Sequence, residues 1–152
     1  MRAFFRVVEL VGSLPVYLVF VLLLFLFSPS WFFLPFGVMV VLVTLVVYVL
    51  KCLFPRARPG RRLVSARWWD VREVADRSFP SAHAAWSGGL FAVSWFFGNW
   101  MPFAAGAFFL LVSWSRVAAG RHRVSEVVVG ALIGMALGVA GWFLSPPLAP
   151  WF

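Results

Sequence analysis

The sequence is poor in charge and in cysteine, and both shortages exclude classes of protein. Charged residues make up 12% of the 152 residues, against about 25% in an ordinary soluble domain. With 63% hydrophobic residues, the chain lacks the polar surface that a water-soluble fold of this length needs. The single cysteine, Cys52, excludes an internal disulfide. The composition therefore indicates an integral membrane protein.

Acidic residues are also scarce, since five of them oppose 13 Lys and Arg, for a formal net charge of +8. Such a balance often marks proteins that bind nucleic acid. Here the cations lie between apolar runs rather than along one basic helix face. The phosphate groups of membrane lipids are therefore the expected partners, and nucleic acid is not.

Long apolar runs are abundant, and five of them are long enough to cross a bilayer, which takes about 17–25 helical residues. The joints between them are short, which favours a compact bundle of helical hairpins. We predict an all-α integral membrane bundle of about five transmembrane helices, formed as a single domain over residues 1–152. The expected spans are 7–27, 31–50, 81–97, 100–119 and 127–144.

Two further patterns predict packing and an interfacial segment. Gly130, Gly134 and Gly138 recur at four-residue spacing in the last run, which is the pattern that lets membrane helices approach closely. The polar loop 60–79 carries Val64, Trp68, Val71 and Ala75 at helical spacing, and Asp70-x-x-Glu73 is able to cap a short helix. We expect an interfacial helix there, with a solvated charged loop as the alternative.

Ionisable residues gather at one side of the expected bundle. Because successive helices run in opposite directions, every Lys, Arg, His, Asp and Glu falls on or near the same membrane face, and the other face has none. Ionisable groups at membrane helix ends are candidates for a functional site. Six of them lie where a helix meets this face: Lys51, Arg58, His83, Arg116, His122 and Glu126.

The cations of this set suit a phosphate group. Lys51, Arg58 and Arg116 together are able to clamp the oxygens of a phosphate, because guanidinium groups match its geometry in pairs of hydrogen bonds. Ser81, which follows a proline, opens a helix whose first N–H groups favour an anion. Taken singly, these residues also have structural interpretations, as a positive loop flank or a helix cap.

The two histidines add the capacity for phosphoryl transfer. Each titrates near neutral pH, so one is able to act as a nucleophile and the other as a general acid. Glu126 lies four residues after His122, and on a helix the carboxylate would share a face with the ring and hold it in one tautomer. One cysteine and no cluster of histidines with carboxylates give no metal site. The set predicts metal-independent phosphoryl transfer through a phosphohistidine, without a cofactor.

Three short motifs carry a family resemblance. Lys51-x6-Arg58-Pro59, Pro80-Ser81-Ala82-His83 and Ser115-Arg116-x5-His122-x3-Glu126 resemble the signature K-x6-R-P, P-S-G-H and S-R-x5-H-x3-D of the type-2 phosphatidic acid phosphatase superfamily. These motifs occupy 51–59, 80–83 and 115–126. Two positions depart from the pattern, since Ala82 replaces glycine and Glu126 replaces aspartate.

The resemblance implies a role for each matched residue. His122 would attack phosphorus with Glu126 orienting it, and His83 would protonate the leaving group and then activate water. Lys51, Arg58, Ser81 and Arg116 would hold the phosphate oxygens. The implied substrates are lipid phosphates or diphosphates, such as phosphatidate, phosphatidylglycerophosphate or a polyprenyl diphosphate, hydrolysed by a multi-pass protein of the cell membrane.

Two alternatives to hydrolysis and two orientations remain open at this point. The protein could pass the phosphoryl group to another lipid, or bind anionic lipids without catalysis. The excess of cations places the motif face in the cytoplasm by the positive-inside rule, whereas the resemblance implies the extracytoplasmic face. A reporter fused at Phe152 would decide between these orientations. The oligomeric state does not follow from the sequence.

Overall fold

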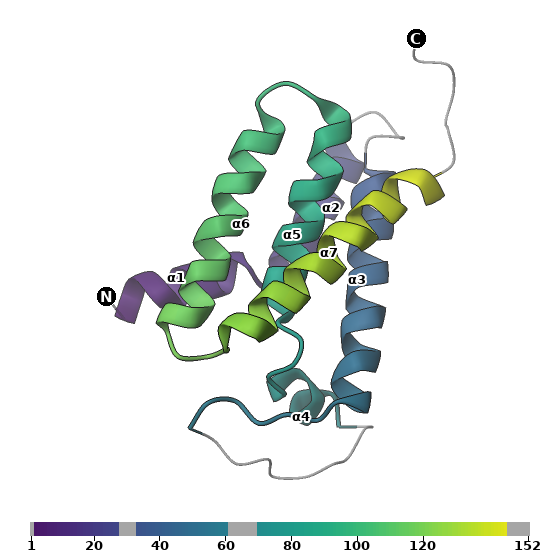
Figure 1. Ribbon diagram of the computed structural model, residues 1–152. Helices are drawn as coiled ribbons and strands as arrows, with labels where there is room; N and C mark the ends of the chain where they lie inside the picture. Colours follow the sequence, from purple (N-terminus) through teal and green to yellow (C-terminus); the bar gives the residue numbers. More distant parts are fainter. Residues whose placement is uncertain (1, 28–32, 61–69, 146–152) are drawn as a thin grey trace.

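The computed structural model describes residues 2–27, 33–60 and 70–145, and every regular element in these ranges is a helix (Figure 1). The prediction of an all-α helical bundle is therefore confirmed. The elements are α1 (Arg2–Val11), α2 (Leu14–Phe27), α3 (Leu34–Leu53), α4 (Val71–Asp76), α5 (Ala82–Ser94), the 3-10 helix η1 (Trp95–Phe97), α6 (Met101–Ala118) and α7 (Val124–Leu144).

Fewer helices than expected are long enough to cross a membrane. Within the described ranges α3, α6 and α7 pass on length and composition, and α1 with α2 makes a fourth if the pair is one bent span. The expected span 81–97 forms α5, which has only 13 residues before the chain tightens into η1. α5 packs against α3, α6 and α7, and Figure 1 shows it between α6 and α7.

The first expected span, 7–27, is broken. α1 and α2 meet at an angle of 51°, because Pro15 has no N–H to offer the carbonyl four residues earlier and its ring crowds that turn. At the break, the hydroxyl of Ser13 donates to the carbonyl of Leu10 at 2.6 Å. α1 therefore turns aside and lies across the end of α6 (Figure 1), where the ring of Phe5 is 5.9 Å from that of Trp114.

The glycine stripe of α7 brings this helix against the backbone of α5. A Cβ atom on Gly134 would lie 1.9 Å from the carbonyl oxygen of Ala85, and one on Gly138 would lie 2.5 Å from that of Gly89. Both distances are far below van der Waals contact, so only glycine permits this approach. The prediction that the stripe serves packing is confirmed.

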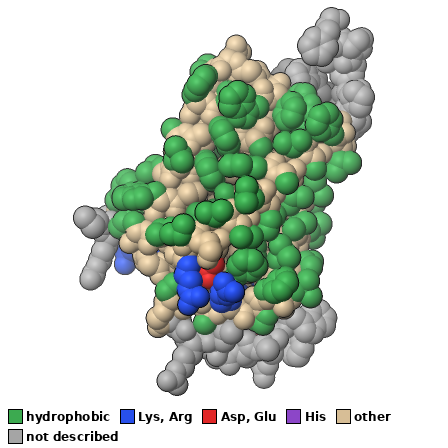
Figure 2. Space-filling view, viewed as in Figure 1, with side chains coloured by type: hydrophobic (Ala, Val, Ile, Leu, Met, Phe, Trp, Pro, Cys, Tyr) green, Lys and Arg blue, Asp and Glu red, His purple; other side chains and the backbone are tan. Residues whose placement is uncertain are grey.

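The outer surface of the bundle is apolar. Hydrophobic side chains cover most of the face in Figure 2, and Lys and Arg gather at one end, below the helices. On α7, for example, Val128, Leu132 and Phe143 are exposed. Such a surface is unfavourable in water and suits lipid, so the chain is a membrane protein.

The polar loop between α3 and α5 contains the short helix α4. The N–H of Glu73 donates to the carboxylate of Asp70 at 3.2 Å, which confirms the predicted cap at Asp70. The other positions of the predicted interfacial helix, Val64 and Trp68, lie outside the described residues. α4 packs on α3 at the basic end of the bundle.

Candidate active site

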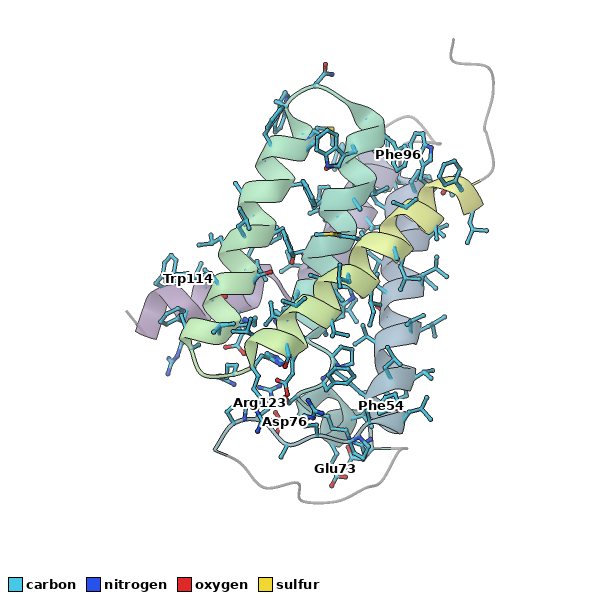
Figure 3. The ribbon with its side chains drawn as sticks, in the orientation of Figure 1. Phe54, Glu73, Asp76, Phe96, Trp114 and Arg123 are labelled. Atoms are coloured by element: carbon cyan, nitrogen blue, oxygen red, sulfur yellow. The ribbon has the colours of Figure 1, made fainter. Side chains whose placement is uncertain are left out.

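The structure brings the sequence-predicted residues to one end of the bundle. In Figure 3, Asp76 and Arg123 mark this end, and Phe96 marks the opposite one. Each residue stands at the end of a helix or in an adjoining loop, so the fold collects them from four separate helices. They are Lys51 near the end of α3, Arg58 in the next loop, Ser81 and His83 at the start of α5, Arg116 near the end of α6, His122 between α6 and α7, and Glu126 in the first turn of α7.

His122 is buried and held by one short hydrogen bond. Its Nδ1–H donates to the backbone carbonyl of Ser78 at 2.8 Å, whereas the nearest carboxylate oxygen of Glu126 is 3.6 Å from Nδ1. A carbonyl can only accept, so this contact fixes the hydrogen on Nδ1 and leaves the lone pair on Nε2. Ser78 is not among the sequence-predicted residues. It acts through its backbone carbonyl, which every residue type has, so the sequence cannot indicate this contact.

The ring of His122 is neutral at physiological pH. The pKa of His122 is lowered to about 4, first by burial and then by the positive charges of Lys51 and Arg58, while the Ser78 carbonyl and Glu126 act in the opposite direction. A neutral imidazole surrounded by cations is a nucleophile poised for an anionic centre.

Glu126 is fully buried and ties the start of α7 to the start of α5. Its carboxylate accepts the N–H of Arg123 at 2.9 Å, and its backbone carbonyl accepts the N–H of Ser81 at 3.1 Å. The first contact caps α7. The carboxylate thus serves the helix start directly and faces His122 at a longer distance.

Lys51 is anchored by a residue that sequence reasoning missed. Its ammonium donates to the backbone carbonyl of Arg77, and the guanidinium of Arg77 donates back to the carbonyl of Lys51 at 2.8 Å. The second contact satisfies one of the free carbonyls at the end of α3. Nearby, Arg58 forms an ion pair with Asp76 at 3.2 Å, which places both predicted cations beside the 75–78 segment.

Glu9, on α1, is another residue that sequence reasoning missed. Its backbone carbonyl lies 3.3 Å from Nε2 of His83. Its carboxylate oxygens lie 3.6 Å from the guanidinium of Arg116 and 3.5 Å from that of Arg121. Glu9 is the only acidic residue before Asp70, and a lone carboxylate in an apolar run is a functional candidate that could have been found.

Ser81 stands at the N-cap of α5 with extended backbone angles. Its buried hydroxyl has no hydrogen-bond partner among the described residues, and the free N–H groups of the first helical turn lie next to it. Ala82, which replaces the glycine of the motif, begins the helix, and among described residues other than glycine only Asn99 has a positive φ. The departure at Ala82 is therefore compatible with this backbone.

The described residues contain no group of three or more His, Cys, Asp or Glu side chains arranged to hold a metal ion.

Comparisons with known proteins give one family and one solved structure. A family model described as the PAP2 superfamily matches residues 32–148, a range that contains all three motifs. A search of curated protein sequences finds no match. The chain resembles the crystal structure of Aquifex aeolicus LpxE with a TM-score of 0.76 and 26% sequence identity, and the alignment covers 93% of this chain and 84% of that one.

Proposed function

The chain belongs to the PAP2 superfamily and is a membrane lipid phosphatase, and we propose that it hydrolyses lipid phosphates or diphosphates through a phosphohistidine formed on His122, without a metal ion. The observation that carries this proposal is the state of His122. Its ring is buried and neutral, and the bond from Nδ1–H to the Ser78 carbonyl leaves Nε2 free to attack.

The first step transfers the phosphoryl group to the enzyme. Nε2 of His122 attacks phosphorus, the bond between phosphorus and the lipid oxygen breaks, and its electron pair stays on that oxygen. His83 gives a proton to this oxygen. Without substrate, burial and the charge of Arg116 lower the pKa of His83 to about 3, and the negative charge of the bound phosphate favours the protonated ring. The imidazolium character that develops on His122 is stabilised by its bond to Ser78 and by the carboxylate of Glu126, 3.6 Å away.

The second step releases phosphate. Neutral His83 takes a proton from water, the water oxygen attacks the phosphohistidine, and the N–P bond breaks to return His122. We assign Lys51, Arg58 and Arg116 as the cations that bind the phosphate oxygens. We assign Ser81 as a hydrogen-bond donor to the phosphate, because its buried Oγ lacks a partner among the described residues. Donors aimed at a transition state in a site shielded from water lower the barrier most.

We also propose that residues 1–152 act as one domain in a multi-pass arrangement in the cell membrane. α1 lies outside the range matched by the family model, but its Glu9 contacts both His83 and Arg116. The N-terminal segment therefore supports the site as well as the bundle.

The test is phosphate release by the detergent-solubilised protein in the presence of EDTA. The substrates are phosphatidate, phosphatidylglycerophosphate and a polyprenyl diphosphate. We expect turnover of at least one lipid, resistance of that turnover to EDTA, and a loss of about 10⁴-fold or more in His122→Ala, since removing a nucleophile leaves only the rest of the site. Ser125→Ala, which alters an exposed side chain near His122, is the matched control.

A covalent intermediate gives a second readout. A brief reaction with radiolabelled substrate should leave label on the wild-type protein that acid removes and alkali does not, and none on His122→Ala. Activity that requires added metal would contradict the mechanism. Consumption of the substrate only when a lipid acceptor is added, with the label recovered on that acceptor and not as free phosphate, would favour phosphotransfer. A folded protein that consumes none of the lipids would favour the non-catalytic binder.

A further inference from the structure

A second cationic pocket adjoins the proposed site. It has a volume of about 270 Å³ and is lined by Phe5, Arg6, Glu9, Arg116, Ala119 and Arg121. α1 supplies one wall and the end of α6 with the following turn supplies the other. Of its lining residues, only Arg116 belongs to the family motifs.

The pocket carries an excess of positive charge. Three arginines, Arg6, Arg116 and Arg121, line the pocket together with one acidic residue, Glu9. The guanidinium groups of Arg116 and Arg121 both pair with its carboxylate. One carboxylate balances only one of these three positive charges, so the pocket keeps a net positive charge. The guanidinium of Arg116 is almost fully buried, and it shares the carboxylate of Glu9 with Arg121. An anion of the ligand would complete the pocket.

The pocket lies on the side of the site where the leaving group must be. His83, the proposed general acid, contacts the backbone carbonyl of Glu9, and Glu9 lines the pocket. His122, the proposed nucleophile, is tied instead to Ser78. In an in-line displacement the nucleophile and the leaving oxygen lie on opposite sides of phosphorus, so a group attached to that oxygen extends from His83 towards the pocket.

We propose that Arg6, Arg121 and the shared Arg116 form a second anion-binding subsite, which holds a further negatively charged group on the leaving side of the scissile bond. This inference rests on the proposed function. In a lipid diphosphate, His122 attacks the terminal phosphorus, the bond from that phosphorus to the bridging oxygen breaks, and the electron pair stays on the phosphate that bears the tail. The subsite receives this second phosphate.

The test compares two substrates that differ only in this group, a polyprenyl diphosphate and the monophosphate of the same alcohol. For Arg121→Gln we expect the KM of the diphosphate to rise about tenfold, because one charge-assisted hydrogen bond to the substrate is lost. The KM of the monophosphate should change by less than about threefold. Glu9→Gln makes the pocket more positive and should lower the KM of the diphosphate. Arg123→Gln, which removes one charge from an exposed side chain, should affect both substrates equally.

Each outcome separates the subsite from the function. Wild-type turnover of the monophosphate tests the proposed function alone, whereas the ratio of the two KM values tests the subsite. Equal changes for both substrates in Arg121→Gln would overturn the subsite and leave the function standing. If wild-type protein hydrolyses neither lipid, calorimetry on His122→Ala still tests the subsite by comparing the binding of the two lipids. Tighter binding of the diphosphate that is lost when Arg121→Gln is added supports the subsite. Equal binding of the two lipids overturns it.

Discussion

At the scale of single residues, the neutral carbonyl of Ser78 rather than a carboxylate is the nearest acceptor for His122. Where a carboxylate alone fixes the catalytic tautomer, replacing it by an amide costs about 10⁴-fold, because the ring then turns to the wrong tautomer. Here the carbonyl 2.8 Å from Nδ1 still accepts the same hydrogen. Glu126 therefore contributes charge to the site more than it sets the tautomer.

We accordingly expect Glu126→Gln to lower kcat/KM by about 10- to 100-fold, the worth of one charged contact, and far less than His122→Ala. The measurement is the kinetics of phosphate release with the same lipid for both variants. Glu126→Gln keeps the length of the side chain and removes its charge, whereas Glu126→Asp keeps the charge and shortens the side chain, so the two variants separate charge from reach. A loss in Glu126→Gln as large as that in His122→Ala would mean that the carboxylate, not Ser78, holds the ring.

The sequence predicts the residue types of the site better than their contacts. Spacing identifies His83, His122 and the phosphate-binding cations, because the chemistry requires particular side chains at particular positions in the sequence. Contacts made by backbone atoms set no such requirement, so the carbonyls of Ser78 and Glu9 emerge only from the fold. The 3.6 Å gap between Glu126 and His122 is likewise a matter of backbone placement, since four-residue spacing alone puts the pair on one helical face.

At the scale of helices, the glycine stripe of α7 sets how closely α5 and α7 pack next to the site. Gly134→Ala would place a Cβ atom 1.9 Å from the carbonyl of Ala85, so α5 and α7 must separate. Overpacking of this kind costs about 1–3 kcal/mol or more. Because the first turns of α5 and α7 are joined by the bond from Ser81 to Glu126, we expect a lower melting temperature in detergent together with lower activity.

Gly37→Ala is the matched control for this change. Its Cβ atom would meet only a methyl carbon of Val21 at 3.7 Å, which is ordinary contact, and alanine inside a helix is favoured over glycine by about 0.5–1 kcal/mol. Its melting temperature should be unchanged or higher. Equal melting temperatures for Gly134→Ala and wild type would contradict the close approach of α5 and α7.

Helix boundaries mark the limit of prediction at this scale. Hydropathy locates the apolar runs but does not show where a run bends, and the run 7–27 divides at Ser13 into helices 51° apart. Pro15 indicates the break, yet only the packing of α1 on α6 shows where the detached helix goes. That placement brings Glu9 into the site. A prediction that misses the bend therefore also misses Glu9 as a residue of the site.

At the scale of the whole molecule, two properties are visible in the sequence: apolar surface in excess and charge at one end. Both follow from composition and from alternating helix direction, and the structure has both (Figure 2). The number of membrane-crossing helices does not follow in the same way. α5 is interior and short, because its flanks are shaped by a proline and a 3-10 turn rather than by the thickness of a bilayer.

The apolar surface and the terminal site together predict how substrate reaches the enzyme. A lipid phosphate stays in the same micelle or bilayer as the protein, because its tail is excluded from water, and it meets the site by lateral movement. At constant bulk substrate, added detergent should therefore lower the rate by diluting the lipid within the micelles. A water-soluble short-chain phosphate should show no such dependence. If the rate of the long-chain lipid follows only its bulk concentration, substrate must enter from water and the site must open away from the membrane.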